Sequence, residues 1–282
     1  MNTQSEQDQL KYDPATHFGF GDNWQTYSQL ITEPKIEQAV TDMKRLFGSD
    51  DLSQQSFIDV GCGSGLHSLV ALRLGAGPVA GFDLDIDSVR TARQVLSQFA
   101  PDQDWTIEQG NVFEALPNND HTYDIVYSWG VLHHTGAMWQ AIEKSMELVG
   151  DQGRFAIAIY RKTPSCNGWR RFKRVYAALP KFFQAALRWP YILLFCLALL
   201  VTGRNPLTYI RTYESNRGMD YFTDVHDWLG GYPYESASPE ELKTFFEARG
   251  FETELEFTKP TRLRGIFGTG CDEFLFRRTK SV

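Results

Sequence analysis

The segment Asp59-Val60-Gly61-Cys62-Gly63-Ser64-Gly65 lies between a short apolar run, residues 57–60, and a stretch with helical periodicity. Three glycines at alternate positions permit a tight turn and let a ligand approach the backbone closely. The turn leads into a helix, so its backbone N–H groups lie at a helix N-terminus, where they can bind polar or anionic groups. This order of strand, glycine loop and helix predicts a nucleotide-binding site.

A second acidic residue supports this interpretation and narrows the choice of ligand. Asp83 ends the next apolar run, residues 79–83, where a carboxylate can accept hydrogen bonds from both hydroxyls of a ribose. Leu66 stands where a dinucleotide fingerprint requires its third glycine, and Leu66-His67 replaces the Lys-Ser/Thr pair of a phosphate-binding P-loop. The pattern therefore disfavours both a dinucleotide-binding site and a P-loop phosphate site.

Strand-like and helix-like segments alternate from residue 56 to residue 160. This alternation predicts a doubly wound, Rossmann-like α/β sheet with mostly parallel strands. The pattern is interrupted after Tyr160 and resumes at Ser238, where a capping box starts a helix that two closing strands follow. We therefore predict three parts, which are an N-terminal helical leader or lid (1–50), a nucleotide-binding core (51–160 and 236–282) and a helical insert (161–235).

The glycine loop behind Asp59 resembles the first motif of class I S-adenosylmethionine-dependent methyltransferases, and the resemblance covers most of residues 56–160 and the closing elements. It implies that fold, S-adenosyl-L-methionine as cofactor and S-adenosyl-L-homocysteine as product. Asp83 matches the ribose-binding acid, Asn111 the adenine-reading position, and Ser128 the loop near the methionine portion. The cofactor-binding residues implied in this part of the chain are Asp59, Gly61, Cys62, Gly63, Gly65, Asp83, Leu84, Asn111, Val112, Ser128 and Trp129.

The segment that follows the fourth predicted strand, residues 127–135, is similar to ubiquinone-biosynthesis-type small-molecule methyltransferases. It contains His133 and His134 at the carboxyl end of a strand, where open α/β sheets bind their ligands. Histidine suits proton transfer near neutral pH, so both are candidate bases, with His133 preferred. The alternative is that one packs into the sheet edge while the other caps or solvates a helix. Trp24 could bind the cofactor as part of a lid, together with Tyr27, or pack in an N-terminal helix.

A second titratable cluster, Asp224, His226 and Asp227, lies in the insert before a Gly-Gly pair. On a helix the two aspartates share one face. Asp227 is therefore a third candidate for a catalytic base or an acceptor contact, with a surface turn or cap as the alternative. Cysteine and histidine are scattered without metal-ligand spacing, so no metal site is predicted.

The net charge of −7 is the sum of two unequal parts. Residues 161–218 contain eleven Lys/Arg and one acid, Glu214, which leaves 17 basic and 34 acidic residues, or −17, for the rest of the chain. The basic, aromatic insert could be a lid over a small acceptor, a membrane-surface helix through residues 169–201, a nucleic-acid contact or a helical cap. Repulsion between phosphates and the acidic remainder disfavours nucleic acid as a partner.

These observations together predict methyl transfer to a small aromatic or apolar metabolite, at oxygen. The alternatives are N- or C-methylation, a tRNA or lipid acceptor, and a non-catalytic cofactor-binding module. The longest apolar run, residues 191–201, is shorter than the roughly 20 residues needed to cross a bilayer, so no transmembrane helix is predicted. Without a signal peptide at the N-terminus, we expect a cytoplasmic protein, with peripheral membrane association through the insert as an option.

Overall fold

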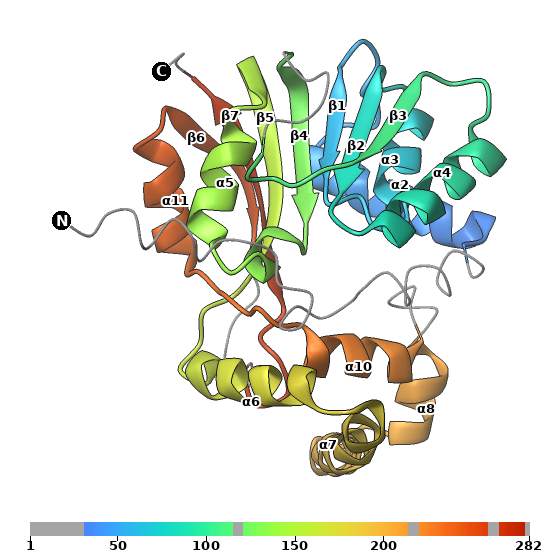
Figure 1. The fold of residues 1–282 in the computed structure, drawn as a ribbon, viewed down its shortest axis with the longest axis vertical. Coiled ribbons are helices and arrows are strands. Elements are labelled where there is room, and N and C mark those ends of the chain that lie inside the picture. Colours follow the sequence, from blue (N-terminus) through green and yellow to red (C-terminus); the bar gives the residue numbers. More distant parts are fainter. Residues whose placement is uncertain (1–30, 115–120, 214–219, 259–264, 280–282) are drawn as a thin grey trace. The chain divides into compact units, whose positions relative to one another are not determined.

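The computed structural model describes residues 31–114, 121–213, 220–258 and 265–279. The chain folds into two compact units. The sheet unit holds the described residues up to Lys162 together with 236–258 and 270–279 (Figure 1). The helical unit holds 163–213, 220–235 and 265–269.

The sheet unit is built on seven strands in the order β3-β2-β1-β4-β5-β7-β6. The five strands β1 to β5 run parallel, and β7 is antiparallel to both of its neighbours. This is the predicted doubly wound, Rossmann-like sheet with mostly parallel strands. The strands are β1 (Phe57–Val60), β2 (Val79–Asp83), β3 (Trp105–Gln109), β4 (Tyr123–Trp129), β5 (Val149–Tyr160), β6 (Phe251–Phe257) and β7 (Cys271–Arg278).

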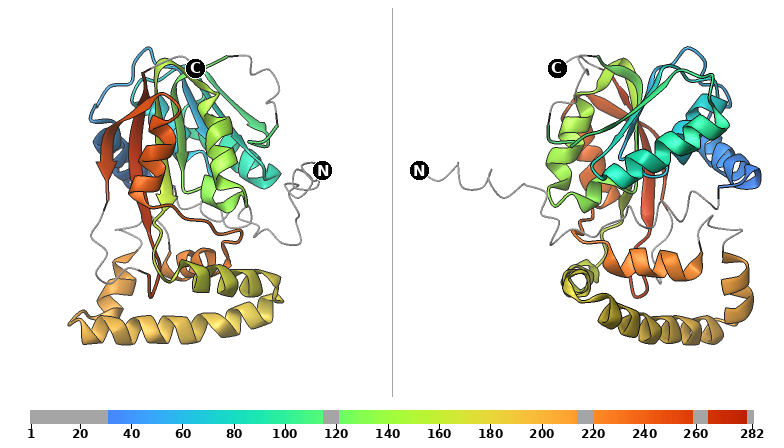
Figure 2. Two further views of the ribbon diagram at one scale, coloured as in Figure 1. Left: turned by 90° about the vertical axis from the view of Figure 1, so that its left-hand side faces the viewer. Right: turned by 45° about the vertical axis from the view of Figure 1, so that its right-hand side comes forward.

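Helices cover both faces of this sheet (Figure 2). Strand residues alternate between two cores, so that Phe57 packs in one and its neighbour Ile58 in the other. The first core also takes up α2 (Glu33–Phe47), α3 (Leu66–Arg73) and α4 (Ile86–Phe99). The second takes up α5 (Met138–Met146) and α11 (Pro239–Glu247), and α11 begins with the predicted capping box at Ser238.

The described end of the predicted N-terminal helical part is helix α2. It buries Ile36, Met43, Leu46 and Phe47 in the first core of the sheet unit. Residues 33–47 are therefore helical, as predicted, and they pack as a layer of the sheet unit. Trp24 and Tyr27, the predicted lid residues, lie outside the described residues, and their roles stay predictions.

The helical unit contains α6 (Cys166–Ala178), α7 (Lys181–Val201), α8 (Pro206–Arg211) and α10 (Tyr221–Gly230), packed around Tyr176, Ile192 and Leu229. The segment 265–269, predicted to belong to the core, is part of this unit. The backbone oxygen of Gly265 accepts a hydrogen bond from the Trp169 indole, and that of Phe267 accepts one from the Tyr191 hydroxyl. These two hydrogen bonds explain why residues 265–269 belong to the helical unit and not to the predicted core.

Helix α7 is longer than the sequence indicates. Pro190 interrupts the pattern, because proline removes a helical hydrogen bond, yet the helix of 21 residues continues on both sides of it. The length on which the prediction of no transmembrane helix rested is therefore too short, because α7 has the length and composition of a membrane span. That the chain does not cross a membrane stays a prediction. Most of α7 is exposed and not buried in a core.

Candidate functional site

The glycine loop joins β1 to α3 at the carboxyl edge of the parallel strands. Gly61, Gly63 and Gly65 have φ angles of 78°, 52° and 77°, a left-handed backbone that side chains with a Cβ rarely adopt. The N–H groups of Gly61 and Cys62 donate to the Phe82 carbonyl at 2.9 and 3.0 Å. This pairing holds the loop against the end of β2.

Two of these glycines are also required by close packing. A Cβ on Gly61 would lie 2.4 Å from a methyl carbon of Val131, which follows β4. A Cβ on Gly65 would lie 2.9 Å from the Cα of Ala92 on α4. The loop therefore sits at the point where β1 meets β4 and the strand order reverses, which is where open α/β sheets bind ligands.

Asp83 occupies the end of β2 directly beside the loop. Its Oδ2 accepts the Gly63 N–H at 3.0 Å, and its Oδ1 accepts the Asp85 N–H at 3.0 Å. Burial raises the pKa of this carboxyl to about 6, although the backbone N–H groups oppose the shift. A carboxylate offers about four acceptor positions, so both oxygens keep capacity for further donors such as a pair of ribose hydroxyls.

Asp59 has a different position from Asp83, although both are acidic residues of adjacent strands. It is buried, and its Oδ2 accepts the Ser68 hydroxyl on α3 at 2.8 Å. Burial raises its pKa to about 7, and the negative charge of Asp83 adds to the shift. Asp59 therefore ties β1 to α3 beneath the loop. Sequence reasoning missed Ser68, which carries no motif signal on its own.

The end of β3 supplies the next predicted contacts. Oδ1 of Asn111 accepts the Phe113 N–H at 3.2 Å, and its amide nitrogen donates to Glu114. One lone pair on Oδ1 is thus used within the turn, and the other is available for an adenine amino group. Val112 is half-buried beside it, and Leu84, after β2, is exposed.

The two residues predicted at the end of β4, Ser128 and Trp129, have different environments. Ser128 is buried, and its hydroxyl donates to the Val60 carbonyl at 3.0 Å, which ties β4 to β1. Trp129 is 41% exposed and lies near His67 of α3, with ring centroids 6.0 Å apart. Burial lowers the pKa of His67 to about 4, so this histidine is neutral at pH 7. Cys62 is buried, and burial raises its pKa well above the usual value.

The two candidate bases lie on the short 3-10 helix η2 (Leu132–His134) after β4. His133 is fully buried, packs against the Tyr160 ring with ring centroids 3.9 Å apart, and accepts the Tyr160 N–H at Nδ1 at 3.3 Å. That hydrogen bond occupies the basic nitrogen. His134 is half-buried and meets Tyr160 edge-on. The geometry thus favours His134 over His133 for contact with an acceptor, which reverses the preference drawn from the sequence.

Asp227 and its neighbours belong to the helical unit, on α10. Asp224 accepts a hydrogen bond from the Tyr213 hydroxyl, and His226 Nδ1 lies 2.9 Å from the Tyr176 hydroxyl. Burial, with Arg188 and Lys181, lowers the pKa of His226 to about 4. The side-chain nitrogen of Lys173 is buried and donates to the Trp228 carbonyl. Burial lowers the pKa of Lys173, and the negative charge of Asp227 opposes that shift. These contacts hold α10 to α6, and a catalytic role of Asp227 stays a prediction.

Residues 51–188 match the model of a family described as "Methyltransferase domain". Over these residues the chain is therefore similar to methyltransferase domains. Its match begins just before β1 and ends within α7, so it contains the glycine loop, Asp83 and the two histidines.

Curated proteins that are similar to part of this chain include ribosomal protein L11 methyltransferases. That of Burkholderia multivorans is 38% identical over 85 residues, which is 30% of this chain and 24% of the relative. That of Cyanothece sp. is 32% identical over 111 residues, which is 39% of this chain and 34% of the relative. The chain thus matches about a quarter to a third of the length of these relatives.

A solved structure with the same fold is magnesium protoporphyrin IX methyltransferase from Synechocystis with bound S-adenosylhomocysteine. Its TM-score is 0.52 at 14% identity, over 99% of this chain and 96% of the other. At this identity the likeness shows the fold alone.

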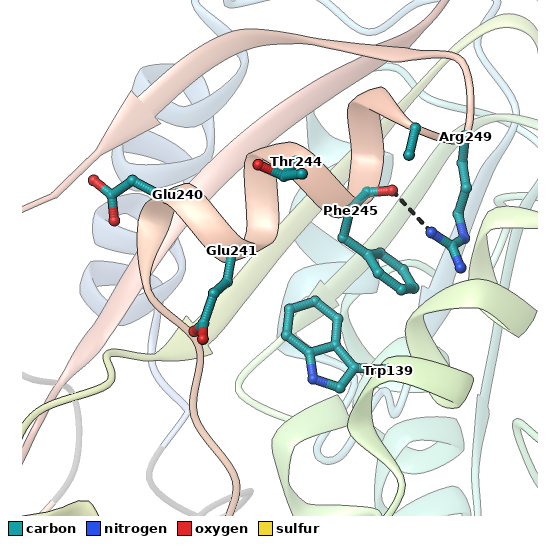
Figure 3. A pocket seen from close by; sticks show the side chains of 7 residues that line it. Trp139, Glu240, Glu241, Thr244, Phe245 and Arg249 are labelled. Atoms are coloured by element: carbon teal, nitrogen blue, oxygen red, sulfur yellow. Dashed lines mark hydrogen bonds between the residues drawn. The ribbon is translucent and has the colours of Figure 1, made fainter.

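A surface depression on the sheet unit lies between α5 and α11 (Figure 3). The Trp139 and Phe245 rings meet there with centroids 4.7 Å apart, and Arg249 lies over Phe245 while it donates to Glu143. None of the predicted site residues lines this depression. Its groups contact one another, and it is separate from the site at the strand ends.

Proposed function

We propose that this chain transfers a methyl group from S-adenosyl-L-methionine to a small aromatic or apolar acceptor, at oxygen. The observation that carries the proposal is the Asp83 carboxylate, which the Gly63 and Asp85 N–H groups hold at the edge of the sheet with acceptor capacity left on both oxygens. The matched family and the order of motifs along β1 to β4 support the same cofactor. Bound cofactor would supply the activated methyl group.

The residues of the chain would provide binding, alignment and proton acceptance. Asp83 accepts the ribose hydroxyls, and Asn111 with the Val112 backbone reads the adenine. Trp129, exposed at the end of β4, would cover the methionine portion. Alignment of acceptor and methyl group is the larger part of catalysis in a displacement of this kind, and a base adds about 10²–10⁴-fold. We assign the base to His134, since the Nδ1 atom of His133 is occupied.

The function can be tested with S-adenosylmethionine labelled in its methyl group. We expect label in small organic-soluble products when the chain is incubated with a panel of phenols and apolar metabolites, together with release of S-adenosylhomocysteine. Ribosomal protein and tRNA serve as competing acceptors in parallel reactions. Label found only in protein or RNA would contradict the acceptor class, and cofactor binding without any turnover would favour a binding module.

Cofactor affinity should depend on pH through Asp83. The ionised carboxylate accepts both ribose hydroxyls, whereas the protonated form loses acceptor capacity and must first release its proton. With a pKa of about 6 in the free protein, affinity should be constant above pH 7 and weaken by about tenfold per pH unit below pH 6. Calorimetric titration of S-adenosylhomocysteine between about pH 5 and about pH 8 measures this. An affinity that is independent of pH would argue against ionised Asp83 as the ribose ligand.

The two histidines should respond differently to the same substitution. We expect His134→Gln to lower turnover of the acceptor found above by at least about tenfold while cofactor affinity stays unchanged. His133→Gln should instead lower the melting temperature, because it removes a buried ring that packs against Tyr160. Steady-state kinetics, cofactor titration and thermal melts of both variants test the assignment. A full loss of turnover in a stable His133→Gln variant would return the base to His133.

A further inference from the structure

Helix α7 presents a wide apolar face that the described part of the helical unit leaves uncovered. Its main side chains are Phe182, Trp189, Leu193, Leu194, Leu197 and Leu200, between 48% and 77% exposed. We call these six residues the outer face of α7. A helix of 21 residues is about 30 Å long, so the outer face is a long apolar strip. Apolar patches of this extent on soluble proteins mark interaction sites.

The opposite side of α7 is already used by the fold. Ile192 and Leu199 are buried in the helical unit, and the Gln184 amide donates to the Tyr176 carbonyl at 3.1 Å. The Tyr191 hydroxyl donates to the Phe267 carbonyl at 2.6 Å. These contacts recur along one stripe from residue 184 to residue 199 and fix which side of the helix faces outward. The outer face is therefore a built surface of a folded unit.

The charge of the surrounding chain indicates what this face meets. Between Thr163 and Tyr213 the sequence has eight Lys/Arg residues and no Asp or Glu. Arg171 and Arg174 are exposed on α6, and Lys181 is exposed at the start of α7. Basic residues beside an aromatic and aliphatic helix face complement an anionic lipid headgroup layer above acyl chains.

We propose that the outer face of α7 docks the protein on an anionic lipid bilayer. The helix lies in the plane of the interface, with its leucines at the acyl boundary and the basic side chains among the headgroups. Spanning the bilayer would strip Gln184 and Tyr191 of their hydrogen bonds and place Arg188 in the hydrocarbon region. The contacts on the inner stripe thus favour a surface position, although α7 is long enough to cross.

The test uses the full chain and vesicles of phosphatidylcholine with and without phosphatidylglycerol, in low salt. We expect co-sedimentation with the anionic vesicles that weakens as salt is raised. The variant Leu193→Asn/Leu197→Asn should lower the partition coefficient by at least about tenfold, because both exposed side chains would lose apolar burial. Arg171→Gln/Arg174→Gln should lower it by about tenfold on anionic vesicles alone.

Ile266→Asn is the matched control, since Ile266 is 66% exposed in the same unit but lies outside α7, and it should leave binding unchanged. Helix content and cofactor affinity confirm that each variant is folded. A second readout is quenching of tryptophan fluorescence by lipids brominated in the acyl chain, which Trp189→Phe should reduce. No binding to anionic vesicles, or equal binding by Leu193→Asn/Leu197→Asn, would overturn the proposal. The proposal would also be overturned if the chain did not bind vesicles but formed a dimer that Leu193→Asn/Leu197→Asn dissociates. The outer face of α7 would then contact a second copy of the chain.

Discussion

Replacing Asp83 by alanine should weaken cofactor binding by at least about 100-fold while the sheet stays folded. Each hydrogen bond from a ribose hydroxyl to an ionised carboxylate contributes about 1.5–3 kcal/mol, and Asp83 is placed to accept two. The substitution also frees the Gly63 and Asp85 N–H groups, which now fix the loop to β2. Isothermal calorimetry with S-adenosylhomocysteine measures the effect.

Asp87→Ala is the matched control for this experiment. Asp87 is an exposed aspartate in the first turn of α4, where it pairs with Arg90, and it should leave affinity within about twofold. Circular dichroism and thermal melts show whether both variants are folded. Micromolar affinity retained in a folded Asp83→Ala variant would refute the assignment of the ribose site, and with it the proposed cofactor.

Gly65→Ala should produce a large loss of stability in the sheet unit. The backbone at residue 65 is left-handed, which costs about 1–2 kcal/mol for a residue with a Cβ. The added methyl would also lie 2.9 Å from the Cα of Ala92, so α3 and α4 must separate, at a cost of about 1–3 kcal/mol. We expect a total loss of about 2–5 kcal/mol in denaturant unfolding.

Gly130→Ala separates these two causes. Gly130 has the same left-handed φ of 77°, yet a Cβ there would meet no atom within 4 Å. It should therefore show the backbone cost alone, about 1–2 kcal/mol. An equal loss in the free energy of unfolding of the two variants would mean that the contact with Ala92 adds no cost. Gly65 would then be required only for its backbone conformation.

The sheet could be predicted because its signals are local. Apolar runs such as residues 57–60 and 123–128 are too short for helices, and the glycines of the loop have a direct backbone reason that the φ angles confirm. Asp83 could be placed because the carboxyl ends of parallel strands share one edge. These inferences need no knowledge of distant contacts.

The remaining features depend on contacts that no local pattern encodes. Pro190 predicts a break, but α7 is held to the helical unit on both sides of it, by Gln184 and by Tyr191. His133 resembles a base by type and position, and only its distance to the Tyr160 N–H shows that Nδ1 is occupied. The link between Asp59 and Ser68 is equally invisible, since a hydroxyl on a helix has many other possible partners.

Residues 265–269 prevent the helical unit from being a single continuous insertion in the chain. Those residues come from the connection between β6 and β7, so the helical unit is assembled from separated stretches of sequence. Removing residues 163–235 alone would leave Gly265 without Trp169 and Phe267 without Tyr191. The helical unit can therefore be exchanged between related enzymes as a cassette only if the β6–β7 connection is exchanged with it.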